Sequence, residues 1–413
     1  MTKSFPGRGR VAVLRTSPET VLTDYARLME LAGFRQALPP DRDTILKINI
    51  SWQTWYPACS TAPWQLEGVI RALQAAGYRN LIGAHNNTVV VNAYVGERNN
   101  KHKYIVDKYG VRNVHLYEPE YRWVRYEPKR PFLVLDKVYP EGVYIPEILI
   151  GRNIIQLPTV KTHVFTTITG AMKNAFGGLL GTKRHWTHGV IHETLVDLLM
   201  IQQDIHPGLF AVMDGTFAGD GPGPRAMRWH EKDVILASAD QVAIDAVSAH
   251  LQGFDPLSLP FIRIAHEMGL GVGDIDQIEI VGEDSDWVRA QNWGFIQEDT
   301  FASRGQKLIY HGALKPFEAF LLRTPLVPWS YFASNFYHNV YWYPFIGRKR
   351  VEAALATKWG RLFAETGVEA GLGGAVMPGM EPKTVITAGV ALVLAGAALG
   401  LGAWWLGRRR RRE

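Results

Sequence analysis

Apolar runs of strand length alternate with helical patterns along the first two thirds of the chain. Residues 11–16, 44–51 and 80–84 are rich in aliphatic and β-branched side chains. Residues 18–32 and 63–76 instead place apolar side chains at helical spacing. Strands and helices that follow one another in this order are typical of a parallel sheet covered by helices.

The same alternation continues farther along the chain. Residues 112–143 are β-like but irregular. The pattern predicts an α/β fold with a mostly parallel sheet flanked by helices, and it leaves the order of the strands open. Further strands are expected at residues 153–157, 209–214, 234–237 and 277–281, and further helices at residues 192–203 and 240–251.

Residues 384–406 form an uncharged, apolar run of 23 residues. A helix rises about 1.5 Å per residue, so this run is long enough for the ~30 Å hydrocarbon core of a bilayer. Trp404 and Trp405 fit an interfacial aromatic belt, and the arginines at 408–412 fit its charged flank. The alternative is a buried core helix that ends in a basic tail. The pattern predicts a C-terminal transmembrane helix that anchors the protein in the cell membrane.

Two arguments about the orientation of this helix disagree. The positive-inside rule places the arginines in the cytoplasm and the globular body outside. Residues 1–10, however, carry no signal-peptide pattern, and exporting a large body without one is unusual. We therefore expect the globular body to be cytoplasmic.

A second unusual stretch, residues 324–346, lacks Asp, Glu, Lys and Arg and is crowded with aromatic side chains. Pro325, Pro328 and Pro344 argue against one continuous spanning helix. Two interpretations remain open: a membrane-proximal segment that lies in the headgroup layer, or an aromatic subdomain packed on the body. The segment also offers a surface for a protein partner.

These features divide the chain into five parts. They are an α/β domain at residues 1–285, an aromatic-rich membrane-proximal region at 286–370, a linker at 371–383, a transmembrane helix at 384–406 and a basic tail at 407–413.

Charge and cysteine content exclude several classes of protein. The net charge is +6, and most of it comes from the basic tail, so the body gives no argument for nucleic-acid binding. The single cysteine, Cys59, excludes an intramolecular disulfide and a cysteine-rich zinc or iron–sulfur site.

The segment 157–197 concentrates side chains that carry chemistry. Glycines let the backbone approach a ligand closely, while Lys, Arg and His supply cationic or proton-transferring groups. His163 and His188 are the candidates for acid–base catalysis. The residues expected to bind a small anionic ligand here are Lys161, Lys173, Asn174, Gly177, Gly178, Lys183 and Arg184.

The histidines also admit other interpretations. His188 and His192 stand four residues apart, so on a helix they would share a face, as two metal ligands do. Each histidine could instead cap a helix or complete the core. The segment has no Walker A motif, and the sequence identifies neither a metal nor a cofactor.

Polar residues at the ends of other strands extend this site. Asp214 lies where open α/β sheets place ligand groups, which makes it a third catalytic candidate. Its Asp-Gly pair also fits a simple turn. Lys47 and Asn49 alternate with Ile48 and Ile50, so they share one side of a strand and are candidates for ligand binding.

Several of these pieces are similar to a known family. The segments KINIS with STAP, LPTVKTH, ITGAMKNAFGGLLG, VMDG with GDGPGP, and ILASADQVAIDAVSA resemble the bacterial and archaeal domain-of-unknown-function 362 family. The likeness runs from about residue 47 to residue 282. Ile48 stands where the family usually has proline, and Ala84 where it usually has an acidic residue. The family has no established general activity, so the resemblance implies no reaction.

Two functions remain open, and the sequence does not decide whether the protein is an enzyme. The first is a membrane-anchored enzyme for a small anionic or amphiphilic substrate, with His163, His188 and Asp214 as catalytic groups. The second is a non-catalytic ligand-binding protein or assembly factor at the membrane, with the same basic pocket. The expected partners are membrane lipid, a small anionic ligand and a protein at the aromatic segment.

Overall fold

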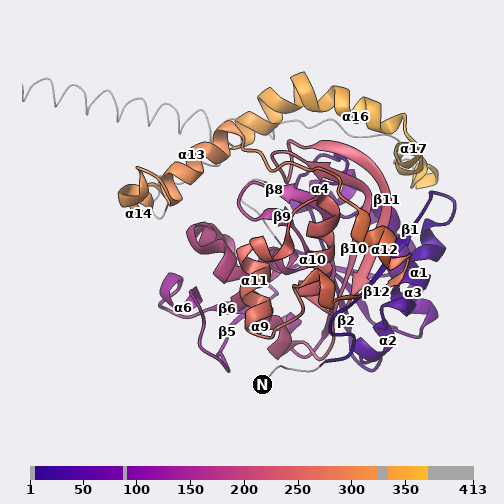
Figure 1. The fold of residues 1–413 in the computed structure, drawn as a ribbon, viewed down its shortest axis with the longest axis horizontal. Coiled ribbons are helices and arrows are strands. Elements are labelled where there is room, and N and C mark those ends of the chain that lie inside the picture. Colours follow the sequence, from indigo (N-terminus) through magenta and orange to yellow (C-terminus); the bar gives the residue numbers. More distant parts are fainter. Residues whose placement is uncertain (1–4, 87–90, 323–333, 371–413) are drawn as a thin grey trace, which may run out of the picture.

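A twisted sheet forms the centre of the fold, and helices cover both of its faces (Figure 1). The computed structural model describes residues 5–86, 91–322 and 334–370. The strands of the sheet are β1 (Arg10–Arg15), β2 (Thr44–Ile48), β3 (Leu81–His85), β4 (Arg112–His115), β7 (Asn153–Leu157), β8 (Thr159–His163), β9 (Thr167–Thr169), β10 (Leu209–Asp220), β11 (Arg228–Ser238) and β12 (Glu279–Gly282).

The order of these strands is β12-β1-β11-β10-β7-β2-β3-β4, with β8 paired to β10 and β9 paired to β8. From β10 through β7, β2 and β3 to β4 all neighbours are parallel. β11 is antiparallel to both β10 and β1, so the sheet is mixed. β2, β3 and β7 are buried along their whole length, because helices cover them on both sides. A separate small sheet pairs β5 (Trp123–Arg125) with β6 (Tyr144–Pro146).

The sheet supports two apolar cores, because successive residues of a strand point to opposite faces. In β1, Val11 and Val13 enter one core, whereas Ala12 and Leu14 enter the other. Helices α9 (Ile191–Ile205), α10 (Gln241–Gln252) and α11 (Pro260–Glu267) pack against the first core. Helices α1 (Val21–Leu31) and α3 (Pro63–Ala75) pack against the second.

The other helices of the described residues connect and extend these layers. They are α2 (Phe34–Ala37), α4 (Ala93–Asn99), α5 (His102–Lys108), α6 (Leu135–Val138), η1 (Glu147–Leu149), α7 (Ala171–Asn174), α8 (Phe176–Leu179), η2 (Thr182–Val190), η3 (Pro256–Ser258), η4 (Ile275–Gln277), α12 (Ser285–Ala290), α13 (Phe301–Tyr310), η5 (Lys315–Phe317), α14 (Glu318–Leu322), η6 (Phe336–Gly347), α16 (Arg348–Leu355), α17 (Lys358–Glu365) and η7 (Val368–Ala370).

The described part of the aromatic segment packs on the body. It forms the π-helix η6, in which Trp342 and Tyr343 are only 4% and 3% exposed. The ring of Trp342 lies 6.1 Å from that of Trp52 and 5.4 Å from that of Tyr56, centre to centre. Over these residues the segment is therefore a packed subdomain, one of the two interpretations that the sequence left open. Residues 324–333 lie outside the described residues.

The predicted fold with a transmembrane helix needs correction. Among the described residues, every helix is too short or too polar to cross a bilayer. The predicted anchor at 384–406, its linker at 371–383 and the basic tail at 407–413 all lie outside the described residues. Over the described residues the structure shows a mixed α/β fold, and the division into domains stays a prediction.

We expect the packing of η6 to contribute strongly to stability. Trp342→Ala would leave a cavity between η6 and Trp52, and such a change typically costs about 3–5 kcal/mol. The neighbouring side chain of Tyr341 is 51% exposed, so Tyr341→Ala should change stability by less than about 0.5 kcal/mol. Thermal unfolding of the two variants measures the difference. Equal, small shifts would contradict the packing.

Candidate functional site

A cavity of about 270 Å³ opens where the parallel strands end. Lys47 and Ile48 are the last two residues of β2, and His85 is the last residue of β3. His163 comes from the end of β8. The cavity thus lies at the carboxyl edge of the sheet, which is the usual ligand site of open α/β folds.

The cavity gathers most of the residues that the sequence singled out. The helices after β9 supply side chains from the glycine-rich stretch, and the loop before β11 supplies Arg225. The predicted site residues that line it are Lys47, Asn49, His163, Lys173, Asn174, Gly177, Arg184 and His188.

The described walls of this cavity carry positive charge without any carboxylate. Lys47, Lys173, Arg184 and Arg225 line it, and none of the described lining residues is Asp or Glu. Burial, reinforced by the charge of Arg184, lowers the pKa of Lys47 to about 7. Burial, together with Lys161 and Arg184, also lowers the pKa of Lys173 to about 7. An anion in the cavity would oppose both effects.

The contacts of Lys47 explain why Gly178 and Asn174 occur in the glycine-rich stretch. A Cβ atom on Gly178 would lie 3.0 Å from Lys47 Cε, so glycine leaves room for the lysine chain. Asn174 Nδ2 donates to the Lys47 carbonyl oxygen at 2.9 Å and to Gln156 Oε1 at 2.9 Å. Asn174 therefore fixes α7 against β2 and β7.

A buried carboxylate outside the cavity holds the start of α7. Asp245 accepts hydrogen bonds from the backbone N–H groups of Ala171 at 2.6 Å and Met172 at 3.1 Å. Burial raises the pKa of Asp245 to about 7. This contact fixes the helix that presents Lys173 to the cavity.

The two histidines of the cavity hold their protons on different ring nitrogens. His163 Nδ1 accepts the backbone N–H of Phe165 at 3.1 Å, so a neutral His163 carries its proton on Nε2. His188 Nδ1 lies 2.9 Å from the carbonyl oxygen of His185, which can only accept, so Nε2 of His188 is an acceptor. Burial and the nearby Lys173 lower the pKa of His163 well below its usual range. Burial is also the main cause that lowers the pKa of His188 to about 4.

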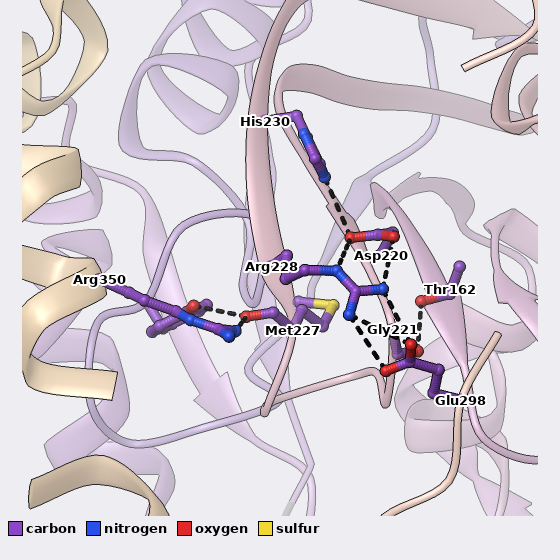
Figure 2. A network of polar contacts seen from close by, with 9 residues as sticks. Thr162, Asp220, Gly221, Met227, Arg228, His230, Glu298 and Arg350 are labelled. Atoms are coloured by element: carbon purple, nitrogen blue, oxygen red, sulfur yellow. Dashed lines mark hydrogen bonds and ion pairs between the residues drawn. The ribbon is translucent and has the colours of Figure 1, made fainter. Parts of the chain in front are cut away.

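Arg225 reaches the cavity from a loop held by a polar network (Figure 2). Its Nε donates to the Ser51 carbonyl oxygen at 2.8 Å. Where the loop ends, Arg228, the first residue of β11, donates to both oxygens of Asp220, the last residue of β10, at 3.0 and 2.9 Å, and also contacts Glu298. Figure 2 shows Arg228 between these two carboxylates. Burial alone would raise the pKa of Asp220, but hydrogen bonds from His230 and Arg228 lower it to about 2.

Four predicted site residues do not line the cavity. Asp214 is buried elsewhere, where it accepts from Tyr25 Oη at 2.7 Å and Trp64 Nε1 at 2.9 Å. Lys161 donates to the Cys59 carbonyl oxygen at 2.7 Å. Gly178 lies against the side chain of Lys47, and the exposed side chain of Lys183 packs over the ring of Trp186. Asp214 thus links β10 to α1 and α3.

The sequence-based prediction of the site omitted several lining residues. Arg225 follows the GDGPGP loop after one predicted strand, and His85 ends β3. The position of each residue near the end of a strand could therefore have identified it as a cavity residue. The metal interpretation of His188 and His192 does not fit the local structure. His188 lies in η2, whereas His192 lies in α9 and stacks on Phe261. In the described parts of the chain, no group of three or more His, Cys, Asp or Glu residues could hold a metal ion.

Two of three comparisons with known proteins find a match. A thylakoid-associated protein, sll1697, of Synechocystis sp. (strain ATCC 27184 / PCC 6803 / Kazusa) is 31% identical over 121 residues, which are 28% of this chain and 37% of that protein. The chain thus matches little more than a third of this relative's length. Comparison with solved structures gives no match. Residues 44–250, half of the chain, match the family described as "Domain of unknown function (DUF362)", and the chain belongs to this family.

Proposed function

We propose that the basic cavity binds a small anion and exchanges protons with it. The observation that supports this most is the set of cationic side chains, Lys47, Lys173, Arg184 and Arg225, in a cavity whose described walls carry no carboxylate. Removing charged groups from water costs free energy unless an opposite charge accompanies them. An anionic ligand supplies that charge.

His163 and His188 supply this anion site with groups that donate and accept protons. In its neutral form, His163 offers an Nε2–H that can donate a hydrogen bond to a substrate oxygen as negative charge develops on it. His188 offers an Nε2 lone pair that can accept a proton. A bound anion would raise the His188 pKa from its low value toward neutrality, because it offsets the positive charge of Lys173. Proton transfer within a small anionic substrate needs no other reactant, so this reaction class suits the site.

Sulfate binding tests the charge argument, because the charge of sulfate is constant between about pH 6 and pH 9. Lys47 and Lys173, with pKa values of about 7, are mainly protonated at pH 6 and mainly neutral at pH 8.5. We expect sulfate affinity, measured by calorimetry, to fall by about tenfold or more over this range. The calorimetric signal in buffers of different ionisation enthalpy should also show proton uptake above pH 7.

A matched pair of variants locates the sulfate. Lys173→Met removes a lining cation and should weaken binding at pH 6 by about tenfold, as expected for a lost charge-assisted hydrogen bond. Lys183→Met removes an exposed cation ten residues farther along and should bind sulfate like the wild type. Affinity that is independent of pH, or equal losses in both variants, would contradict the proposed anion site.

His163→Asn separates catalysis from ligand binding alone. The Asn Oδ1 can still accept the Phe165 N–H, so folding should be retained, whereas the donor at the Nε2 position is lost. We expect a near-normal melting temperature and no complementation of a deletion strain. His192→Asn, outside the cavity, serves as the control. Full complementation by a folded His163→Asn protein would favour the non-catalytic binding protein.

We also propose that the protein works in association with a membrane. The name of the Synechocystis relative, a thylakoid-associated protein, supports this, as do exposed apolar side chains around α13 and α14. Phe301, Phe317 and Phe320 are 87%, 56% and 59% exposed. In Figure 1 these helices lie at one side of the molecule, away from the sheet. Apolar side chains in such a position suit an interfacial contact.

Cell fractionation of the full chain tests this association. The wild-type protein should sediment with membranes, and replacing Phe301, Phe317 and Phe320 by Ser should move part of it to the supernatant. The control variant replaces Glu127, Lys129 and Arg304, which are polar and exposed, by Ser. Buried apolar residues such as Val11, Val13 and Phe261 are left unchanged. Wild-type protein in the supernatant, or unchanged sedimentation of the Phe variant, would contradict this surface.

A further inference from the structure

The cations of the basic cavity fall into two groups. The first, which we call the Lys47 group, consists of Lys47 at the end of β2, Lys173 in α7 and Arg184 in η2. Burial is the main cause of the lowered pKa of both lysines, and the charge of Arg184 adds to it in each case. Arg225 affects the pKa of neither lysine. Because the interaction between charges weakens with distance, Arg225 lies farther from the two lysines than Arg184 does.

The contacts of Arg225 place it at a different wall of the cavity. It lies in the loop between β10 and β11, and its Nε donates to the Ser51 carbonyl oxygen at 2.8 Å. Burial raises the pKa of the Cys59 thiol, and the charge of Arg225 partly opposes this effect. Both contacts belong to the segment that follows β2. The cavity therefore has a second cationic position, apart from the Lys47 group.

The guanidinium of Arg225 keeps one hydrogen-bonding edge available. Within the described structure neither of its Nη atoms has a hydrogen-bond partner, and neither is closed off from solvent. Two Nη–H groups side by side match the two oxygens of a carboxylate, which can accept from both at once. An arginine held at Nε and open at both Nη atoms thus favours a planar carboxylate.

The Lys47 group also has a donor available for an anion. Among the described residues, Lys173 Nζ has no hydrogen-bond partner and is not closed off from solvent. It lies 5.4 Å from the centre of the Phe176 ring. A lysine ammonium acts as a compact point charge and binds an anionic oxygen without demanding a planar partner. Two separate anionic groups can therefore bind in one cavity.

The size and the apolar walls of the cavity limit what can join these two groups. A cavity of about 150 Å³ in another protein holds benzene, so a cavity of about 270 Å³ has room for roughly ten non-hydrogen atoms. Ile50, Phe176 and Pro224 line it beside the cations. Such walls suit a short carbon chain. An aliphatic dicarboxylate of about four to six carbons meets these limits of size and polarity.

We propose that the ligand of the basic cavity is a small aliphatic dicarboxylate, with one carboxylate at the Lys47 group and the other paired with both Nη atoms of Arg225. This assignment rests on the proposed anion site and adds the second charge of the ligand. Arg225 is then the residue that determines specificity, because it distinguishes a dicarboxylate from a monocarboxylate of the same length.

Calorimetry with succinate, glutarate and adipate tests the second charge. Each diacid is compared with its own monoamide, in which a neutral amide of nearly the same shape replaces one carboxylate. At about pH 6.5 the carboxylates are ionised and both lysines are mainly protonated. We define the selectivity as the dissociation constant of the monoamide divided by that of the diacid. For the diacid that binds most tightly, we expect a selectivity of about tenfold or more, as for a charge-assisted hydrogen bond.

Three variants assign this selectivity to Arg225. Arg225→Gln should lower it to near one, and Arg225→Lys should retain part of it, because lysine keeps the charge without the paired donors. Lys173→Met should weaken the diacid and its monoamide alike and so retain most of the selectivity. Lys183→Met, which removes an exposed cation outside the cavity, should retain both the affinities and the selectivity.

Sulfate binding to the wild type separates this proposal from the one on which it rests. Loss of sulfate binding would contradict the anion site itself. Normal sulfate binding, with every diacid bound no more tightly than its monoamide, would overturn the dicarboxylate assignment alone. Full selectivity in a folded Arg225→Gln protein, with folding checked by thermal unfolding, would overturn it too.

Discussion

The burial of lysine ammonium groups without carboxylate partners is the constraint on which the basic cavity depends. Lys47 Nζ donates to the Ile48 carbonyl oxygen at 2.8 Å, and Lys161 Nζ donates to the Cys59 carbonyl oxygen and to Thr159 Oγ1. A carbonyl or hydroxyl oxygen carries only partial charge, so it offsets less of the lost hydration than a carboxylate would. The pKa of Lys47 therefore falls to about 7 and that of Lys161 to about 8, with burial as the main cause. A bound anion would supply the full negative charge that these carbonyl and hydroxyl oxygens do not carry.

The acidic side chains near the sheet serve the fold instead. Asp245 holds the start of α7, and Asp240 accepts from the backbone of Gly9, Val242, Ala243 and Val272. These carboxylates point at backbone N–H groups and so tie distant segments together. Because they lie outside the cavity, they fix its walls in place without neutralising its cations. Structural and ligand-binding charges are thus separated by position in the fold.

The spacing of residues along the sequence predicted the features that depend only on neighbouring residues. Alternation along residues 47–50 pointed to Lys47 and Asn49, the glycine-rich stretch pointed to Lys173, Asn174 and Arg184, and all five line the cavity. Contacts between residues remote in the sequence, which no local pattern shows, decide where Asp214 lies. Asp214 stands at a plausible position in β10, but Tyr25 and Trp64, remote in the sequence, enclose it. The family assignment is confirmed over residues 44–250, because it rested on motifs rather than on single residues.

Residues 334–370 pack against the two loops that carry Ser51 and Arg225 of the cavity wall. Trp52 follows Ser51 of the cavity wall, and its Nε1 donates to Asn339 Oδ1 at 2.9 Å. Arg350 Nη1 donates to the Met227 carbonyl oxygen at 2.6 Å, two residues after Arg225. One segment therefore braces both loops that meet at the Arg225–Ser51 hydrogen bond. Aromatic side chains suit this task, because they bury large areas while their N–H and O–H groups remain available for hydrogen bonds. This packing explains the buried rings of Trp342 and Tyr343, whereas Tyr341 and Phe345 of the same helix stay 51% and 69% exposed.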